Sequence, residues 1–169
     1  QKLIQDKINK VKSKKVRVLF SAHSLPVSII KKGDPYQWQV EQTVSAVMKG
    51  IQGHEDHVLA YQSKVTPVKW LEPTTPSEIE KAIHEDRALV IVPIAFVSDH
   101  SETLVELDIE YQKLASELGC KHYYRSESLN IDQNFIESLS EIVSESEKIE
   151  NGNIRQKICP ATFKQCDQE

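Results

Sequence analysis

The sequence predicts an α/β fold in three layers, with a four-stranded parallel sheet and helices on both of its faces. Short apolar runs rich in β-branched residues alternate with segments of helical periodicity, in the order helix and then strand–helix four times. Parallel strands need long crossover connections, and helices in those connections cover the faces of the sheet. The 169 residues, with 39% hydrophobic and 27% charged side chains, suit one globular domain.

The first elements are a helix, a strand and a second helix. Apolar residues in Gln1–Lys14 recur at helical spacing, whereas Val16–Ser21 is a β-branched and aromatic run typical of a buried strand. Ala22–Asp34 is then expected to form a loop. Asp34 followed by Pro35 is typical of an N-cap and a first-turn proline. The helix expected after them has apolar residues at i, i+4, i+7, i+8 and i+11, namely Val40, Val44, Val47, Met48 and Ile51.

The second strand is expected at His57–Ser63. Three prolines interrupt Lys64–Pro76, so this stretch is not expected to be helical. Ser77 and Glu80 have the spacing of a capping box and predict the start of the next helix.

The most apolar stretch, Ala88–Val97, is typical of a central strand buried on both faces, although Pro93 predicts a bend or a strand end. A long helix over Ser101–Leu118, a strand at His122–Arg125 and a last helix over Asp132–Lys148 complete the pattern. Residues 1–148 form the expected domain. Residues 149–169 are polar and unpatterned, and we expect them to form a flexible tail.

Composition excludes several function classes. The net charge of −4 argues against a basic nucleic-acid binder, and no dinucleotide, P-loop or hydrolase-elbow motif occurs. No apolar run approaches the roughly 20 residues of a membrane span, and the polar amino terminus is not typical of a secretory signal. Three cysteines, an odd number, fit a reducing compartment, so we expect a cytoplasmic protein. Because the first residue is Gln, we expect a fragment or a processed product.

Ligands of open parallel sheets bind beyond the carboxyl ends of the strands. Three segments are expected there, at 21–26, 62–70 and 98–102. His23 lies in the first of them and Glu102 in the third. One imidazole and one carboxylate can hold a divalent first-row metal, and an imidazole can accept a proton near neutral pH. The alternative for His23 is a loop histidine with a satisfied hydrogen bond.

Three glutamates, Glu102, Glu106 and Glu110, follow one another at i, i+4 and i+8 in the helix after the third strand. Like charges at this spacing repel by a few tenths of a kcal/mol per pair, on the order of 0.2–0.5 kcal/mol. Such a row is tolerable on a wet helix face, which is the simpler interpretation, or on a face that a cation visits.

Other candidates carry weaker signals. His54 and His57 have ligand-like spacing but lie in a polar loop, which favours a surface role. Trp70 follows a proline-rich loop at a strand end, so a cleft position and a core position are equally supported. Cys159 and Cys166 form no CxxC motif, so their spacing gives little support for a metal site.

Four runs together resemble the carboxyl-terminal half of ferrochelatase, the enzyme that inserts ferrous iron into protoporphyrin IX. The resemblance covers residues 1–148 in the family's order. The runs are LFSAHSLP (19–26), YQSKVTPVKWLEP (61–73), VPIAFVSDHSETLVELDIEY (92–111) and RSESLN (125–130).

The resemblance implies roles for individual residues. His23 matches the active-site histidine at the iron and porphyrin centre, Glu102 matches the carboxylate paired with it, and Trp70 matches a tryptophan beside the macrocycle. It also implies a π-helical stretch in the helix after the SDH run. A polar track that conducts metal or protons is implied at Asp99, His100, Glu106 and Glu110.

The same resemblance implies a lyase of haem biosynthesis whose substrates are Fe²⁺ and protoporphyrin IX, with no cofactor required and no nucleic acid bound. The porphyrin lies between two similar halves in this family, so the amino-terminal half is a missing partner and the isolated fragment is expected to be inactive. Peripheral contact with the inner membrane is also implied. Some members bind a [2Fe–2S] cluster through three closely spaced carboxyl-terminal cysteines. The tail here offers only Cys159 and Cys166, which argues against a cluster.

Two other functions stay open from the sequence. One is a non-catalytic haem- or metal-binding module that reuses the fold, because fold alone does not prove function. The other is a cobalt chelatase of similar architecture, which is less favoured because the SDHSETL run resembles the iron enzyme more closely.

Overall fold

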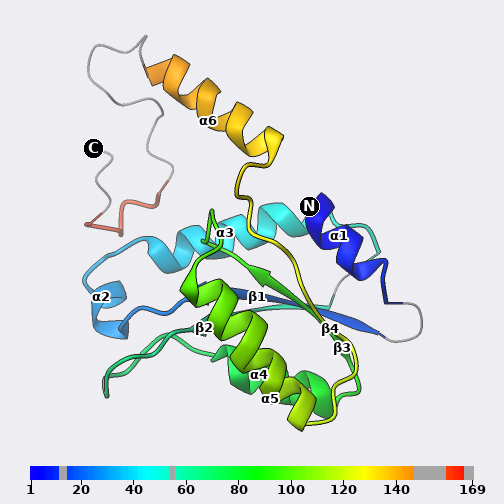
Figure 1. Ribbon diagram of the computed structural model, residues 1–169. Coiled ribbons are helices and arrows are strands. Elements are labelled where there is room, and N and C mark those ends of the chain that lie inside the picture. The colour runs from blue at the N-terminus through cyan, green and yellow to red at the C-terminus, as the bar shows by residue number, and fades with distance from the viewer. Residues whose placement is uncertain (12–14, 54–55, 147–158, 166–169) are drawn as a thin grey trace.

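The computed structural model describes residues 1–11, 15–53, 56–146 and 159–165, and Figure 1 traces the chain. Four strands form one sheet: β1 (Val16–His23), β2 (His57–Gln62), β3 (Ala88–Pro93) and β4 (Tyr123–Arg125). Their order is β2-β1-β3-β4 and every pair is parallel. The predicted four-stranded parallel sheet is confirmed, and β1 lies inside it with a hydrogen-bonded neighbour on each side.

Helices cover both faces of the sheet, which confirms the three-layer prediction (Figure 1). One face packs against α1 (Lys2–Ile8) and α3 (Tyr36–Met48). The other face packs against α4 (Thr75–His84), the π-helix η1 (Glu102–Glu110) and α5 (Tyr111–Glu117).

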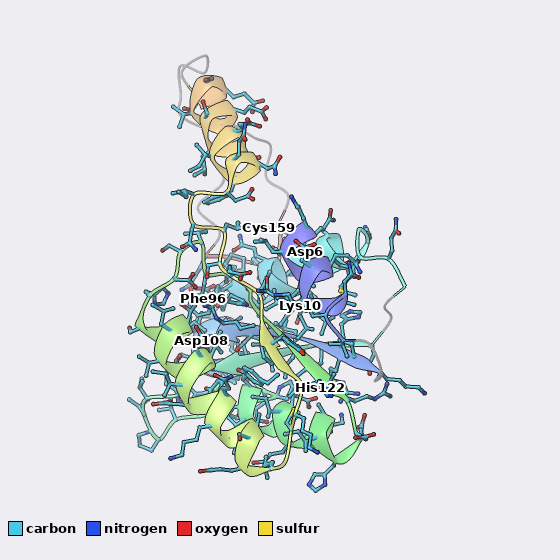
Figure 2. The ribbon with its side chains drawn as sticks, turned by 45° about the vertical axis from the view of Figure 1, so that its right-hand side comes forward. Asp6, Lys10, Phe96, Asp108, His122 and Cys159 are labelled. Atoms are coloured by element: carbon cyan, nitrogen blue, oxygen red, sulfur yellow. The ribbon has the colours of Figure 1, made fainter. Side chains whose placement is uncertain are left out.

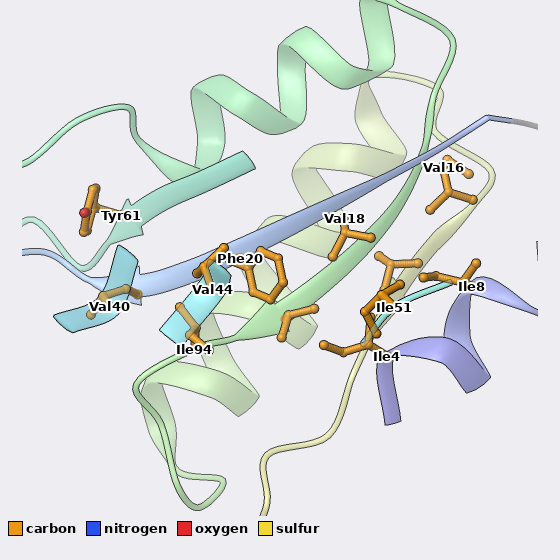
Figure 3. Packing of buried hydrophobic residues seen from close by; sticks show 14 of the residues in the cluster. Ile4, Ile8, Val16, Val18, Phe20, Val40, Val44, Ile51, Tyr61 and Ile94 are labelled. Atoms are coloured by element: carbon orange, nitrogen blue, oxygen red, sulfur yellow. The ribbon is translucent and has the colours of Figure 1, made fainter. Parts of the chain in front are cut away.

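Strand β1 divides its buried side chains between these two layers. Val18 and Phe20 belong to the cluster under α1 and α3, shown in Figure 3, whereas Leu19 belongs to the cluster under α4, η1 and α5. Successive side chains of a strand point to opposite faces. Continuing this alternation places Ser21 and His23 on the same face as Leu19, which is the face that η1 covers.

Two helix starts differ from their predicted caps. The N-cap of α4 is Thr74, whose hydroxyl oxygen accepts a hydrogen bond from the Ser77 amide at 3.2 Å, so the predicted capping box at Ser77 is wrong. The helix begins earlier because Pro76 has a backbone already suited to a first turn. At α3 the helix boundary falls at Pro35, and the side chain of Asp34 accepts from the Tyr36 amide at 2.8 Å.

The predicted loop at 22–34 contains a short helix, α2 (Val27–Lys31), that the sequence pattern did not indicate. Five residues are too few to show helical periodicity. The first helix ends at Ile8 and is shorter than its prediction over Gln1–Lys14.

The third strand ends at Pro93, four residues before the predicted end at Val97. Proline has no N–H to donate to a sheet ladder, so it stops the pairing as its position suggested. The predicted helix over Ser101–Leu118 is split into η1 and α5. This split confirms the π-helical stretch that the family resemblance implied.

The last helix, α6 (Gln133–Ser146), forms as its periodicity predicted but has no buried residue. Figures 1 and 2 show it standing clear of the sheet. It therefore does not cover the sheet as the other helices do. Its exposed apolar residues are Ile136, Leu139, Ile142 and Val143.

Part of the predicted tail is described. Cys159 is buried and lies near α3, where the Gln39 amide nitrogen is 3.6 Å from its sulfur. The ring of Phe163 is 5.9 Å from that of Trp38. The remaining tail residues, Cys166 among them, lie outside the described residues, so the expected flexibility of the tail stays a prediction. None of the described helices combines the length and the apolar character that a membrane crossing needs.

Candidate active site

His23 and Glu102, the central pair of the sequence analysis, lie together at the carboxyl ends of the strands. Nδ1 of His23 is 2.9 Å from Oε2 of Glu102, and each side chain is 36% exposed. His23 is the last residue of β1, where the ladder to β2 pairs it with Gln62, while the ladder to β3 ends two residues earlier at Ser21. The pair is therefore held by the sheet at one end and is open to a ligand at the other.

Tyr36 supports this pair from the amino terminus of α3. Its hydroxyl group donates a hydrogen bond to the His23 carbonyl oxygen at 2.8 Å. Burial, together with the negative charge of Glu102, raises the pKa of Tyr36 to about 12. The hydroxyl group therefore keeps its proton at neutral pH and stays a donor to the backbone of His23.

Glu102 is the first residue of the π-helix η1. Its backbone carbonyl oxygen accepts a hydrogen bond from the side-chain amide of Gln62 at 2.8 Å. Its amide donates to Nδ1 of His100 at 3.2 Å, and the His100 ring lies 5.2 Å from that of Phe96. The backbone of Glu102 is thus bonded on two sides by side chains from other segments.

Glu106 lies one turn further along η1, and three donors hold its carboxylate. Ser63 Oγ is 2.6 Å from it, and Gln62 Nε2 and the Tyr111 hydroxyl are each 3.2 Å from it. Burial and the charge of Glu106 raise the pKa of Tyr111 above its ordinary value. The tyrosine consequently stays protonated and serves as a donor to the carboxylate.

The three glutamates of the predicted row, Glu102, Glu106 and Glu110, line a single pocket of about 430 Å³. Ser63 and Tyr111 lie in its wall as well. The π-helix closes its hydrogen bonds from i to i+5 rather than i to i+4, yet the three carboxylates still converge on one side. The three glutamates therefore lie on a solvent-exposed face of the helix, as the simpler interpretation expected. This face is also concave, so a cation could enter it.

Asp99 belongs to a different set of contacts and does not line this pocket. Its carboxylate accepts hydrogen bonds from Arg125 at 2.8 Å, Asn130 at 2.9 Å, Ser128 at 3.0 Å and Thr103 at 3.2 Å. Burial alone would raise its pKa, but the hydrogen bonds from Asn130 and Ser128 and the charge of Arg125 lower the pKa of Asp99 below the ordinary value. Asp99 is therefore held as an anion within a structural network.

Trp70 is buried, with 8% of its surface exposed, and its indole N–H donates to the Thr66 carbonyl at 2.8 Å. A backbone bridge joins it to Pro26, three residues beyond His23. The sequence supported both a cleft position and a core position for Trp70. In this chain on its own Trp70 is buried, next to the segment that follows His23.

The weaker candidates lie elsewhere. His57 begins β2 and pairs in register with Val18, at the end of β1 remote from His23, and His54 lies outside the described residues. Within the ranges that the structure covers, no group of three or more His, Cys, Asp or Glu side chains could hold a metal ion.

Sequence reasoning missed Gln62, Ser63 and Arg125. Arg125 donates to both Asp99 and Asp108, and the other two hold the π-helix. The available signal was a polar pair at the end of an otherwise apolar strand, Gln62 and Ser63, directly beside the expected position of His23.

The family comparison decides the assignment. The model of the ferrochelatase family matches residues 1–147 of this chain. The chain belongs to the ferrochelatase family.

Ferrochelatases from several bacteria are similar to this chain. That of Pelagibacter ubique is 46% identical over 164 residues, which cover 94% of this chain and 48% of the relative. That of Rickettsia bellii is also 46% identical, over 93% of this chain and 46% of the relative. The ferrochelatase of the Wolbachia of Brugia malayi is 50% identical over 127 residues, which cover 75% of this chain and 36% of the relative. This ferrochelatase-family chain therefore spans about half the length of the curated relatives it matches.

A solved structure supports the fold alone. It is a putative cobalamin (vitamin B12) biosynthesis CbiX protein from Marinobacter aquaeolei, with a TM-score of 0.51 and 14% sequence identity. The match covers 78% of this chain and 97% of that one. Nearly the whole of that protein thus aligns in fold with most of this chain.

Proposed function

We propose that the protein to which this chain belongs inserts ferrous iron into protoporphyrin IX. Membership of the ferrochelatase family supports the reaction class. The observation that carries the proposal is the contact between His23 and Glu102, 2.9 Å apart and each about one-third exposed. A basic ring and a carboxylate lie side by side at the sheet edge where parallel folds bind ligands.

The chemistry requires a proton acceptor and a route for the metal. Insertion of Fe²⁺ into the free porphyrin breaks two pyrrole N–H bonds, forms the iron–nitrogen bonds, releases two protons and strips water from the ion. A planar macrocycle presents its nitrogen lone pairs poorly, so binding energy from the rest of the ring is expected to distort it.

His23 and Glu102 fit the proton part of this reaction. If Nδ1–H of His23 donates to the Glu102 carboxylate, Nε2 carries the free lone pair that accepts a pyrrole proton. The carboxylate then stabilises the imidazolium that forms. The alternative is that Nε2 ligates the iron during transfer, with Glu102 delivering the ion. The pocket at Glu102, Glu106 and Glu110 is on this proposal the path by which metal arrives or protons leave.

The test is the variant His23→Ala in the full-length enzyme, with iron insertion followed by the absorbance of the product. A positioned general base contributes about 10²- to 10⁴-fold, so at least a 100-fold loss of kcat is expected. His84→Ala is the matched control, because His84 is exposed at the end of α4 and lies outside the site. Activity of His23→Ala within a few-fold of the parent would refute the assignment. Formation of more moles of product than of enzyme would show turnover, which a non-catalytic binding module cannot give.

We further propose that the partner of this chain is the amino-terminal half of the same enzyme, because this chain covers only 48% of the Pelagibacter ubique relative. Large apolar side chains are exposed along α6 and beyond the end of β3. An apolar pocket of about 270 Å³, with Val97 and Leu129 in its wall, lies between α1, α3 and the segments after β3 and β4. Monomeric proteins rarely leave such a surface open, so we expect the absent half to cover it. The apolar residues beyond the strand ends are Val97, Leu129 and Ile131.

A further inference from the structure

Gln62 is a neutral side chain that the proposed chemistry does not use, yet it is 1% exposed at the edge of the site. It ends β2 and is the register partner of His23 on β1. In parallel strands, partners in register point to the same face of the sheet. The amide of Gln62 therefore projects from the sheet on the same side as the imidazole of His23, toward η1.

The hydrogen bonds of this amide are satisfied across three elements. Its oxygen accepts from Ser21 Oγ on β1 at 2.7 Å. Its nitrogen donates to the carbonyl oxygen of Glu102 at 2.8 Å and to the carboxylate of Glu106 at 3.2 Å. A buried amide needs such partners, because leaving one unsatisfied costs about 1–3 kcal/mol. Satisfying the amide in this way places the first turn of η1 against β1 and β2.

These hydrogen bonds also bear on why the helix is a π-helix. Such helices are rare and occur mostly as short stretches at functional sites, and disturbances of the helical ladder usually have a cause such as an inserted side chain. Gln62 bonds a backbone carbonyl at one turn and a side chain at the next. The carbonyl oxygen of Glu102 therefore accepts a hydrogen bond from a side chain of β2, in addition to any bond within its own helix.

We propose that Gln62 is a positioning residue that fixes the register of η1 and so aims the carboxylate of Glu102 at His23. The effect of this role on catalysis rests on the proposed function. The placement of Glu102 by Gln62 does not. The Ser21–Gln62–Glu102 connection ties the helix to the same strand that carries the imidazole. The positions of His23 and Glu102 are thus both set relative to β1.

The experiment compares the full-length enzyme with its Gln62→Met variant, which keeps the length of the side chain and removes the amide. A crystal structure of the variant is expected to show Glu102 beyond hydrogen-bonding distance of His23, with the first turn of 102–110 displaced or changed to α-helical register. A misplacement of about 1 Å costs about 10²-fold in rate, so kcat is expected to fall about 100-fold while the KM for porphyrin changes less than about threefold. Gln112→Met, on the exposed side of α5, is the matched control.

The outcomes separate the two proposals. A His23–Glu102 hydrogen bond that persists unchanged in Gln62→Met would overturn the positioning role, whatever the activity. Separation of the two side chains supports the role, and if kcat nevertheless stays at the parental value, the proposed chemistry of the pair fails instead. Should Gln62→Met not fold, Gln62→Glu carries the same test with the same expected fall in kcat. A carboxylate at that position cannot donate to the Glu102 carbonyl, and persistence of the His23–Glu102 hydrogen bond in that variant would equally overturn the role.

Discussion

Replacing Arg125 by Met should destabilise the chain measurably, because this side chain joins β4 to both ends of the segment that carries Glu102. Its guanidinium group donates through Nη1 to Asp99 at 2.8 Å and through Nη2 to Asp108 at 2.8 Å, with a further bond from Nε to Asp108. Asp99 precedes η1 and Asp108 lies within it. Arg125 is 12% exposed, against 20% for Asp99 and 34% for Asp108.

The magnitude follows from that partial burial. Breaking a fully buried ion pair costs about 3–5 kcal/mol, and an exposed pair contributes about 0–1 kcal/mol. Asp99 keeps three other donors in the variant, and Asp108 is reached by solvent. An intermediate decrease of about 2–3 kcal/mol in the free energy of unfolding is therefore expected, which corresponds to a Tm lower by roughly 5–10 °C for a domain of this size.

Urea denaturation followed by far-UV circular dichroism measures this free energy. Arg125→Lys should recover part of the decrease, since lysine keeps the charge but cannot bond Asp108 through two nitrogens. Lys113→Met is the control, because the Lys113–Glu117 pair is exposed and its removal should cost less than about 0.5 kcal/mol. A cost for Arg125→Met no larger than that of the control would refute the reasoning.

Two other expectations follow from the same network and from the exposed apolar surface. Because the pKa of Asp99 is lowered in the folded chain, its contribution to stability is complete above the ordinary range of an aspartate and is lost as the pH falls through and below about 4. Urea titrations at successive pH values measure the free energy of unfolding, which should fall less steeply with decreasing pH in Asp99→Asn than in the parent chain. The same dependence on pH in both proteins would contradict the network described for that carboxylate. Isolated, the chain should self-associate through the apolar residues of α6, which gel filtration detects. Ile136→Glu combined with Val143→Glu should restore the monomer, and a monomeric parent chain at high concentration would count against an uncovered surface.

Much of the fold could be predicted because its signals are local. The apolar run at Ala88 and the β-branched run at Val16 are central strands, and their burial on both faces is what continuous apolar sequence indicates. Helical periodicity located α3 and α6. Periodicity could not show that no residue of α6 is buried, since an amphipathic face looks the same whether or not another surface covers it.

The candidate site was predictable only in part. Strand ends placed His23 near Glu102, and the distance of 2.9 Å between their side chains agrees with that expectation. The π-helix followed from the family resemblance, because the spacing of Glu102, Glu106 and Glu110 suits either helix type. The hydrogen bonds of Gln62 could not be predicted, since a polar residue at a strand end is ordinarily interpreted as the start of a loop. The four donors around Asp99 lie up to 31 residues from it along the chain, beyond the reach of any local pattern.

The anchoring of the two proposed reactive groups is unequal. The imidazole stands at the end of an interior strand, which is paired with β3 up to Ser21 and with β2 through His23 itself. The carboxylate stands on the first turn of the π-helix η1, which is joined to the strands by side-chain hydrogen bonds and not by a sheet ladder. Protein breathing begins where bonding is sparse and reaches central strands last. Excursions that part the two groups are therefore expected to be movements of the carboxylate rather than of the imidazole, and the bonds from Gln62 to η1 limit their size.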